Sequence, residues 1–145
     1  MSFGKVSTRL RERVRQRADG LCEYCRIPEW ATFAEHQIDH ILPRRHGGRT
    51  AAPNLALACA CCNQFKGTDI SAFDPLDGEL VRLYHPRQQD WSEHFRFASI
   101  RIQGLSSSGR ATTRHLRFNE TPRIEERRNL AKLGALDTRN PSAEF

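Results

Sequence analysis

Apolar residues recur at helical spacing near the start of the chain. Leu10, Val14 and Ala18 stand at every fourth position, so residues 7–18 are expected to form a helix with one apolar face. Ser7 can cap the start of this helix, and Gly20 can end it. Arginines alternate around the apolar positions and therefore wrap the helix. Solvation or contact with phosphate would account equally well for Arg9, Arg11, Arg13, Arg15 and Arg17.

Two short apolar segments and a helix follow. The segment "EHQIDHIL" predicts a strand that ends at Pro43, and "NLALA" predicts a second strand. The loop between them contains Gly47 and Gly48, which give the backbone conformational freedom. The segment "CACCNQFKG" then predicts a short helix stopped by Gly67. The order of strand, loop, strand and helix is that of a ββα unit.

The C-terminal half has a different pattern. A turn at Gly78 precedes "ELVRLY", whose alternation predicts a strand, and "SIRIQGL" alternates again. Helices are expected over 106–118 and over 121–133, the second with Thr121 as N-cap, Pro122 at the first position and Gly134 just past its end. The chain is therefore interpreted as an α+β protein in three parts. A basic N-terminal helix occupies 1–20, a ββα core 21–70, and a mixed extension 71–145.

The cysteines stand in two pairs with the spacing of metal ligands. Cys22 and Cys25 form one C-x-x-C pair, and Cys59 and Cys62 form the other, so four thiolates can surround a structural Zn²⁺. A redox pair is the alternative, but no βαβ pattern surrounds either motif. Five cysteines, an odd number, also argue against a fully paired disulfide framework. Cys61 is left over as a spare thiol.

Composition and charge narrow the class of protein. Apolar residues make up 38% of the 145 residues, so the core is modest and a metal would help to define it. The formal net charge of +6 suits a polyanion such as nucleic acid, although it also suits solubility alone. The N-terminus has no apolar targeting segment, and no stretch has the length of a membrane span. We therefore expect a cytoplasmic protein with no membrane partner.

Polar residues lie between and directly after the cysteine pairs. Asp39 and His40 are adjacent, so a regular strand would point them to opposite faces, whereas a strand end or a kink before Pro43 could bring them together. Asn63 follows the last cysteine, so the zinc ion would hold it in place. Carboxylate and amide oxygens suit Mg²⁺, and the histidine would remain free to act as a base.

The segment from Cys22 to Gly67 resembles the HNH endonuclease family. The matching features are the two C-x-x-C pairs, "DHILP", "HGG", "NLALAC" and "CCNQFKG", in the family's order. The resemblance implies a ββα-metal (His-Me finger) fold that cuts DNA with Mg²⁺ or Mn²⁺, in addition to the structural zinc. The C-terminal stretch also resembles an extension found in a group of bacterial HNH proteins.

The resemblance implies roles for individual residues. His40 corresponds to the general base, Asp39 to the metal-binding carboxylate and Asn63 to the second metal ligand. Asn54 corresponds to the asparagine that ties the loop together and helps to orient the base. Lys66 lies one helical turn beyond Asn63, where its ammonium could hold a phosphate.

Other residues in this region allow more than one interpretation. The loop residues Arg44, Arg45, His46 and Arg49 could contact phosphate or be solvated. His36 is interpreted as a surface histidine, with a role as a third metal ligand or as a hydrogen-bond partner of a ligand as the alternative. Trp30 and Phe33 are expected in the core, with base stacking as the alternative.

A DNA endonuclease is the leading interpretation, with RNA as an alternative substrate. The second is a zinc-braced nucleic-acid-binding module without catalysis. A toxin or effector nuclease that acts with a separate targeting partner is a third. The sequence predicts no particular oligomeric state.

Overall fold

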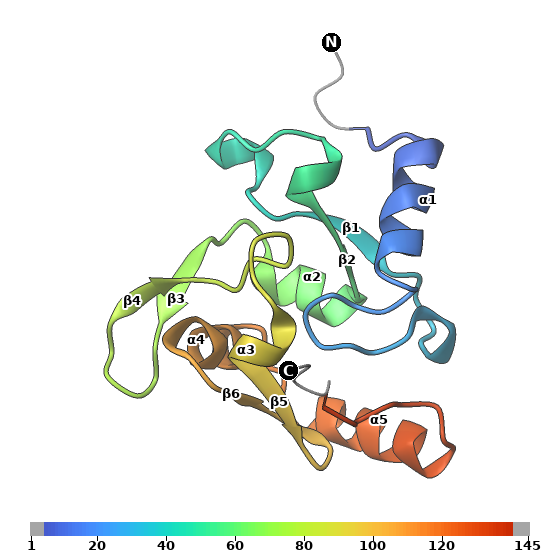
Figure 1. Ribbon diagram of the computed structural model, residues 1–145, viewed down its shortest axis with the longest axis vertical. Coiled ribbons are helices and arrows are strands. Elements are labelled where there is room, and N and C mark those ends of the chain that lie inside the picture. Colours follow the sequence, from blue (N-terminus) through green and yellow to red (C-terminus); the bar gives the residue numbers. More distant parts are fainter. Residues whose placement is uncertain (1–4, 141–145) are drawn as a thin grey trace, which may run out of the picture. The chain divides into compact units, whose positions relative to one another are not determined.

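The computed structural model describes residues 5–140, which divide into two units (Figure 1). The first is the chain up to Ile70 with His85–Gln88, and the second comprises Ser71–Tyr84 and the chain from Gln89 onward. Both contain helices and two-stranded antiparallel sheets, so the predicted α+β class is confirmed. No helix in these residues is both long enough and apolar enough to cross a membrane.

The first unit contains the predicted ββα arrangement. Helix α1 begins at a capping residue, because the Leu10 N–H donates to Ser7 Oγ at 3.1 Å. Strands β1 and β2 pair antiparallel with Asp39 opposite Ala56 and His40 opposite Leu55. The elements are α1 (Thr8–Arg17), the 3₁₀ turn Glu29–Ala31, β1 (Gln37–His40), the 3₁₀ turns Arg44–His46 and Ala52–Asn54, β2 (Leu55–Ala58) and α2 (Ala60–Lys66).

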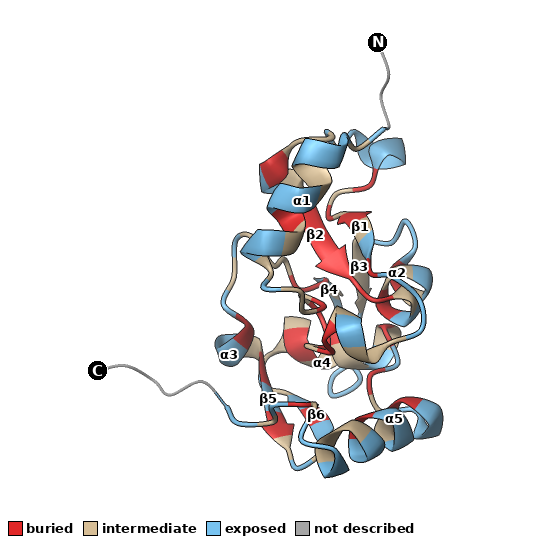
Figure 2. Cartoon of the chain, turned by 90° about the vertical axis from the view of Figure 1, so that its right-hand side faces the viewer, coloured by how far each residue is buried: buried red, intermediate tan, exposed pale blue. Residues whose placement is uncertain are grey.

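Strand β2 is the centre of this unit. All four of its residues are buried, as Figure 2 shows in red along the strand. Val14 of α1 packs on Leu55 and Leu57, with Leu10, Ala18 and Ile38 around them. The apolar face read from the sequence therefore covers the β1–β2 hairpin.

Two arginines of α1 stabilise the fold. Arg15 forms a bidentate ion pair with Glu29, with N–O distances of 2.9 and 3.1 Å. Arg17 donates to the carbonyl oxygens of Ala52 and Leu55 at 2.9 and 2.6 Å. Hydrogen bonds to the protein thus engage these two guanidinium groups, and Arg9 and Arg13 are exposed on the same helix.

Up to residue 140, the second unit contains two hairpins and three helices. Its elements are β3 (Ser71–Phe73), β4 (Leu80–Arg82), α3 (Trp91–His94), β5 (Phe95–Ala98), β6 (Arg101–Gly104), α4 (Ser107–His115) and α5 (Thr121–Lys132). Strand β3 pairs with β4, and β5 pairs with β6.

Aromatic rings form the core of the second unit. The ring centroid of Phe95 lies 5.1 Å from that of Tyr84, 5.3 Å from that of Trp91 and 5.7 Å from that of Phe118. These side chains are buried, and such offset or edge contacts add to the free energy of burial. This core is separate from the aliphatic core on β2.

The sequence missed or shifted some elements of this unit. Helix α5 has Glu120 as its N-cap, so the prediction of Thr121 at that position was wrong by one residue. Strands β3 and β5 and helix α3 were not predicted. They are three or four residues long, which is too short for a periodic pattern to stand out.

Two glycines let α4 pack closely against its neighbours. A Cβ on Gly109 would lie 2.1 Å from the carbonyl oxygen of His94, and one on Gly104 would lie 2.4 Å from the backbone nitrogen of Arg110. Neither partner is the mobile end of a side chain. The backbone of α4 is therefore in direct contact with the backbone of α3 at Gly109 and with that of β6 at Gly104.

We expect Gly109→Ala to lower the free energy of unfolding of this unit by about 1–3 kcal/mol, because the added methyl group overpacks the contact. The neighbouring substitution Ser108→Ala is the control and should change it by less than about 0.5 kcal/mol. Urea unfolding followed by the fluorescence of the buried Trp91 measures both values. Equal stabilities of the two variants would contradict the close approach.

Candidate functional site

Four cysteines meet in the first unit. The Sγ atoms of Cys22, Cys25, Cys59 and Cys62 all lie within 4.8 Å of one another, and all four residues are buried. Across residues 5–140 no other group of three or more His, Cys, Asp or Glu side chains comes close enough to share a metal ion. The Cys25 and Cys59 sulfurs are 3.7 Å apart, close to the sulfur–sulfur edge of about 3.8 Å in a tetrahedron with Zn–S bonds of about 2.3 Å.

The surroundings of the cluster keep its thiols protonated unless a cation is bound. Within each pair, the N–H of the second cysteine points at the sulfur of the first, at 3.4 Å for both Cys25 and Cys62. Hydrogen bonding to Cys22 and Cys25 raises the pKa of Cys59, and burial raises that of Cys62. Four thiolates this close repel one another unless a cation neutralises them. The donor set therefore fits zinc.

The first cysteine pair is joined to the hairpin through Glu23. Its N–H donates to the carbonyl oxygen of Leu57 at 2.8 Å, and its carboxylate accepts from the Leu57 N–H at 2.7 Å. The carboxylate also forms an ion pair with Arg87. The loop that carries Cys22 and Cys25 is thus hydrogen-bonded to β2 through Glu23.

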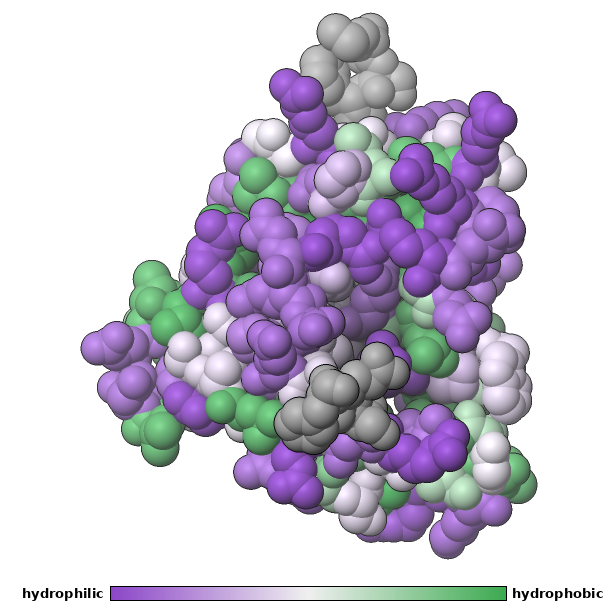
Figure 3. Space-filling model, viewed as in Figure 1, coloured by the Kyte–Doolittle hydropathy of each residue, from purple (hydrophilic) through white to green (hydrophobic). Residues whose placement is uncertain are grey.

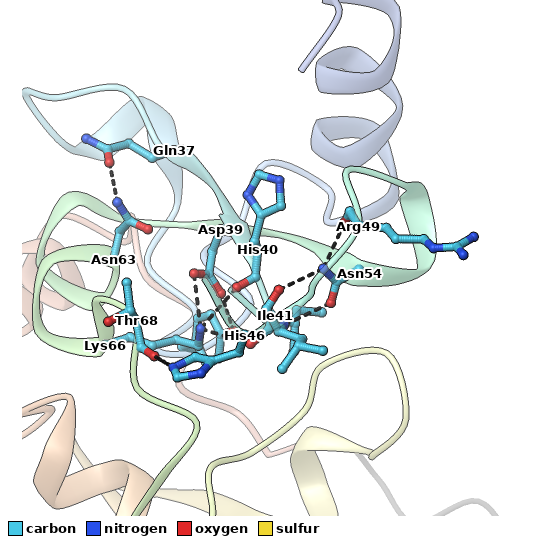
Figure 4. Close-up of polar contacts among 12 residues, drawn as sticks. Gln37, Asp39, His40, Ile41, His46, Arg49, Asn54, Asn63, Lys66 and Thr68 are labelled. Atoms are coloured by element: carbon cyan, nitrogen blue, oxygen red, sulfur yellow. Dashed lines mark hydrogen bonds and ion pairs between the residues drawn. The ribbon is translucent and has the colours of Figure 1, made fainter. Parts of the chain in front are cut away.

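Asp39 is a buried carboxylate with a partner on each oxygen. It is 4% exposed, Tyr24 donates to Oδ2 at 2.7 Å, and the Lys66 ammonium lies 3.2 Å from Oδ1 (Figure 4). Burial raises the pKa of Asp39, and Lys66 and Tyr24 oppose that rise. Burial and the nearby Asp39 raise the pKa of Tyr24 well above its usual value, so its hydroxyl remains a donor.

Lys66 lies elsewhere than expected. We expected its ammonium to reach a phosphate, but the residue is 1% exposed. Besides Asp39, the ammonium donates to the carbonyl oxygens of His40 and Ile41 at 3.2 and 3.1 Å. Three acceptors inside the unit thus satisfy the charge, because α2 turns this side chain toward β1.

His40 points to the other side of β1. Its ring lies away from the Asp39–Lys66 pair in Figure 4, as the alternation of a regular strand requires. The kink that could have joined Asp39 and His40 is therefore not seen in this strand. The ring Nε2 lies 2.8 Å from Thr50 Oγ1. Burial, with Arg44 and Lys66 as further causes, lowers the pKa of His40 and favours the neutral imidazole.

Asn54 holds the loop that follows β1. Its side chain accepts from the Leu42 N–H at 2.8 Å and donates to the carbonyl oxygens of Leu42 and Arg49 at 2.9 and 2.8 Å. Gly48 packs against the backbone of Leu42, and a Cβ on Gly48 would lie 1.6 Å from the Leu42 carbonyl oxygen. The loop can therefore close only with glycine at this position.

Asn63 lies at the middle of α2, next to β1. Its Nδ2 donates to Oε1 of Gln37, which leaves Oδ1 to accept from or bind another group (Figure 4). Arg44, Arg45, His46 and Arg49 are exposed on the loop. His46 also lies against the Thr68 carbonyl oxygen, at 3.0 Å from Nε2.

Three minor expectations near the site were wrong. Trp30 and Phe33 are 75% and 114% exposed, so neither belongs to the core. His36 is 1% exposed, and its Nε2 lies 2.9 Å from the carbonyl oxygen of Ile27. Trp30 lies in a single 3₁₀ turn and Phe33 in the loop after it, where no periodic pattern indicates which side chains are buried.

The sequence interpretation missed the partners of the site residues. Tyr24, Thr50 and Gln37 each hydrogen-bond to a candidate site residue. Tyr24 lies inside the first C-x-x-C pair, which was the available signal. Thr50 and Gln37 carried none, because their contacts depend on the closing of the loop and on the packing of α2.

Comparison with known families identifies this part of the chain. Residues 22–69 match the model of the HNH endonuclease family. Together with the four-cysteine cluster, this match confirms the resemblance. Residues 22–69 therefore form an HNH endonuclease domain.

One curated relative matches part of the chain. Over 81 residues the chain is 43% identical to the CRISPR-associated endonuclease Cas9 of Corynebacterium diphtheriae. The match covers 52% of this chain and 7% of the relative, so the chain spans a small part of that protein's length. No solved structure matches the chain. The two sequence matches support a nuclease function.

We expect about one zinc ion per chain by elemental analysis, and unfolding of the HNH domain when Cys59 is replaced by serine. Cys61→Ser is the matched control, because Cys61 is exposed and outside the cluster. Circular dichroism and zinc content should be unchanged in the control. A folded Cys59→Ser protein without zinc would contradict the role of the cluster.

We expect Lys66→Met to lower the free energy of unfolding by about 3–5 kcal/mol, since it leaves Asp39 buried without its cation. The double substitution Asp39→Asn with Lys66→Met should recover part of this loss, because no unpaired charge remains. Denaturant unfolding in the presence of zinc measures both. A single variant as stable as the parent protein would contradict the pairing.

Proposed function

We propose that the HNH domain hydrolyses phosphodiester bonds of DNA, with His40 as general base and a single divalent ion, Mg²⁺ or Mn²⁺, held by Asp39 and Asn63. The proposal rests above all on Asp39, His40 and Asn63 standing at β1 and α2 within a segment that matches the HNH endonuclease family. RNA is the alternative substrate.

His40 would take the proton from the attacking water. In the tautomer in which Nε2 donates to Thr50, Nδ1 carries the lone pair that accepts this proton. The lowered pKa of His40 keeps the ring neutral and ready for this role near neutral pH. Thr50 would orient the ring, and Asn54 would act through the loop as a positioning residue.

Asp39 and Asn63 offer the oxygen atoms that a hard cation prefers. When bound, the ion would polarise the phosphate and stabilise the leaving oxygen. Asn63 has Oδ1 available because Nδ2 is engaged with Gln37. Asp39 already holds the Lys66 ammonium, so a divalent ion would have to join or replace a cation at that carboxylate.

The exposed loop residues would bind the nucleic-acid backbone. Arg44, Arg45, His46 and Arg49 present positive or polar groups beside His40, at the end of β1. Contacts of this kind depend on phosphate charge and not on base sequence. They would hold the scissile strand while the residues on β1 and α2 act.

A non-catalytic zinc-braced binding module is the second candidate function. One observation favours it: both oxygens of Asp39 already have protein partners. A pure binding module, however, needs no histidine directly after this carboxylate in the sequence, with a ring held neutral by burial. Cleavage assays with and without Mg²⁺ distinguish the two candidates.

We expect His40→Ala to slow cleavage of supercoiled plasmid by about 10²–10⁴-fold, the usual loss on removal of a general base. Parallel reactions with Mg²⁺, with Mn²⁺ and without added divalent ion measure the metal requirement. His115→Ala, outside the HNH domain, is the control and should cleave at the parent rate with the same zinc content.

Equal rates for His40→Ala and the parent protein would refute the assignment of the base. A parent protein that binds DNA but cleaves none of these substrates would favour the binding module instead.

A further inference from the structure

The second unit contains an open pocket that the HNH domain does not use. Its volume is about 780 Å³, and β6, α4 and the turn that precedes α5 line it. Four arginines contribute to the lining, against one acidic residue, Glu120. The pocket therefore has a net positive charge.

The four arginines differ in what they contact. Arg110 is engaged by the buried Asp74, which accepts from Nε at 3.0 Å and from Nη2 at 2.8 Å. Arg117 and Glu120 form a half-exposed pair with an N–O distance of 3.6 Å, a separation at which surface pairs contribute little. Arg101 and Arg114 are exposed, and neither guanidinium group has a hydrogen bond or ion pair to any part of the chain that the structure describes.

The pocket walls are held by buried polar contacts. Asn119 clamps β6, because its side chain accepts from the Ile102 N–H at 2.9 Å and donates to the Ile102 carbonyl oxygen at 2.7 Å. From α5 the buried Arg127 donates to Asn119 at 3.1 Å and to the Ile100 carbonyl oxygen at 2.6 Å. The close contact of Gly104 with Arg110 holds α4 against β6 on the other side. The walls are thus preorganised around Arg101 and Arg114, whose guanidinium groups are open to a ligand.

The geometry points to this pocket as a second nucleic-acid contact, in which Arg101 and Arg114 bind phosphates of the sugar–phosphate backbone. The inference rests on the proposed action of the protein on nucleic acid. Guanidinium groups match phosphate oxygens in shape and charge. Two separate arginines on the rim, one from β6 and one from α4, suit a chain of phosphates better than a single small anion.

The neighbouring hairpin supports an extended polyanion as the occupant. Phe73, Leu76 and Leu80 of the β3–β4 hairpin are 63%, 73% and 63% exposed, and Pro75 of the same hairpin lines the pocket. Apolar side chains gather on the molecular surface over this hairpin in Figure 3. Proteins that bind duplex DNA often insert apolar side chains such as Phe, Leu and Pro between base steps, next to cationic contacts with the phosphates.

The test is binding of a short fluorescent duplex to full-length protein, measured by anisotropy over a range of salt concentrations. His40→Ala protein without added divalent ion is the starting form, so that cleavage does not interfere. The pocket variant adds Arg101→Ala and Arg114→Ala. The matched control adds Arg96→Ala and Arg128→Ala, which remove the same charge from exposed positions outside the pocket lining.

We expect the pocket variant to bind on the order of ten-fold more weakly and to lower the slope of log K against log salt by about 2, as for two lost phosphate contacts. The control should bind within about two-fold of the starting form, because only the general field changes. A third variant with Arg101→Lys and Arg114→Lys should keep the salt slope, since the positive charges remain. Melting temperatures confirm that all variants are folded.

Equal weakening in the pocket variant and the control would overturn the inference. The inference would also be overturned if replacement of Arg101 and Arg114 left duplex binding unchanged but weakened the binding of polyglutamate. The occupant of the pocket would then be an acidic protein. Plasmid cleavage by the parent protein separates the two proposals. If the parent protein cleaves plasmid and the pocket variant binds DNA as well as the control, only this inference is refuted. If the pocket variant loses binding and the parent protein cleaves nothing, only the proposed hydrolysis is refuted.

Discussion

The HNH domain depends on how one buried carboxylate is neutralised. Asp39 lies on β1, its cation comes from Lys66 on α2, and its hydroxyl donor comes from Tyr24 between two cysteines of the metal-type cluster. An unpaired charge at this depth would cost several kcal/mol, so these three segments have to meet in one arrangement. The four cysteines join two of the same segments at a second point. The residue proposed to bind the catalytic ion is therefore also one that holds the domain together, and changes at Asp39 affect both stability and chemistry.

The basic residues of this chain fall into two classes that the net charge does not separate. Arg15, Arg17, Lys66 and Arg127 are engaged by carboxylates or carbonyl oxygens and stabilise the fold. Others are exposed, on the loop at 44–49 and around the pocket of the second unit. The second class can bind a polyanion, whereas the first cannot do so without breaking internal contacts. The formal charge of +6 therefore does not by itself indicate where nucleic acid would bind.

The sequence predicted the parts of the structure that are encoded by local spacing. The paired cysteines, the apolar face of α1 and the ββα order depend on residues close together in the chain, and all three are found in the structure. The direction of Lys66 could not be predicted, because it depends on which face of α2 packs against β1. The partnership of His40 with Thr50 likewise depends on the closing of a loop, and the short elements of the second unit have no periodic pattern. Short-range patterns in the sequence thus indicate which residues form the site. The ion pairs and hydrogen bonds that these residues make depend on long-range contacts.

The position of Cys61 has a practical consequence. Its thiol is exposed on α2, while the other four thiols are buried together in the cluster. A maleimide fluorophore would therefore attach at one defined point, two residues before Asn63, without competing for the buried sulfurs. Without any change to the sequence, a label on Cys61 would report on the helix that carries Asn63 and Lys66, so that ligand-induced movements of that helix can be followed in solution.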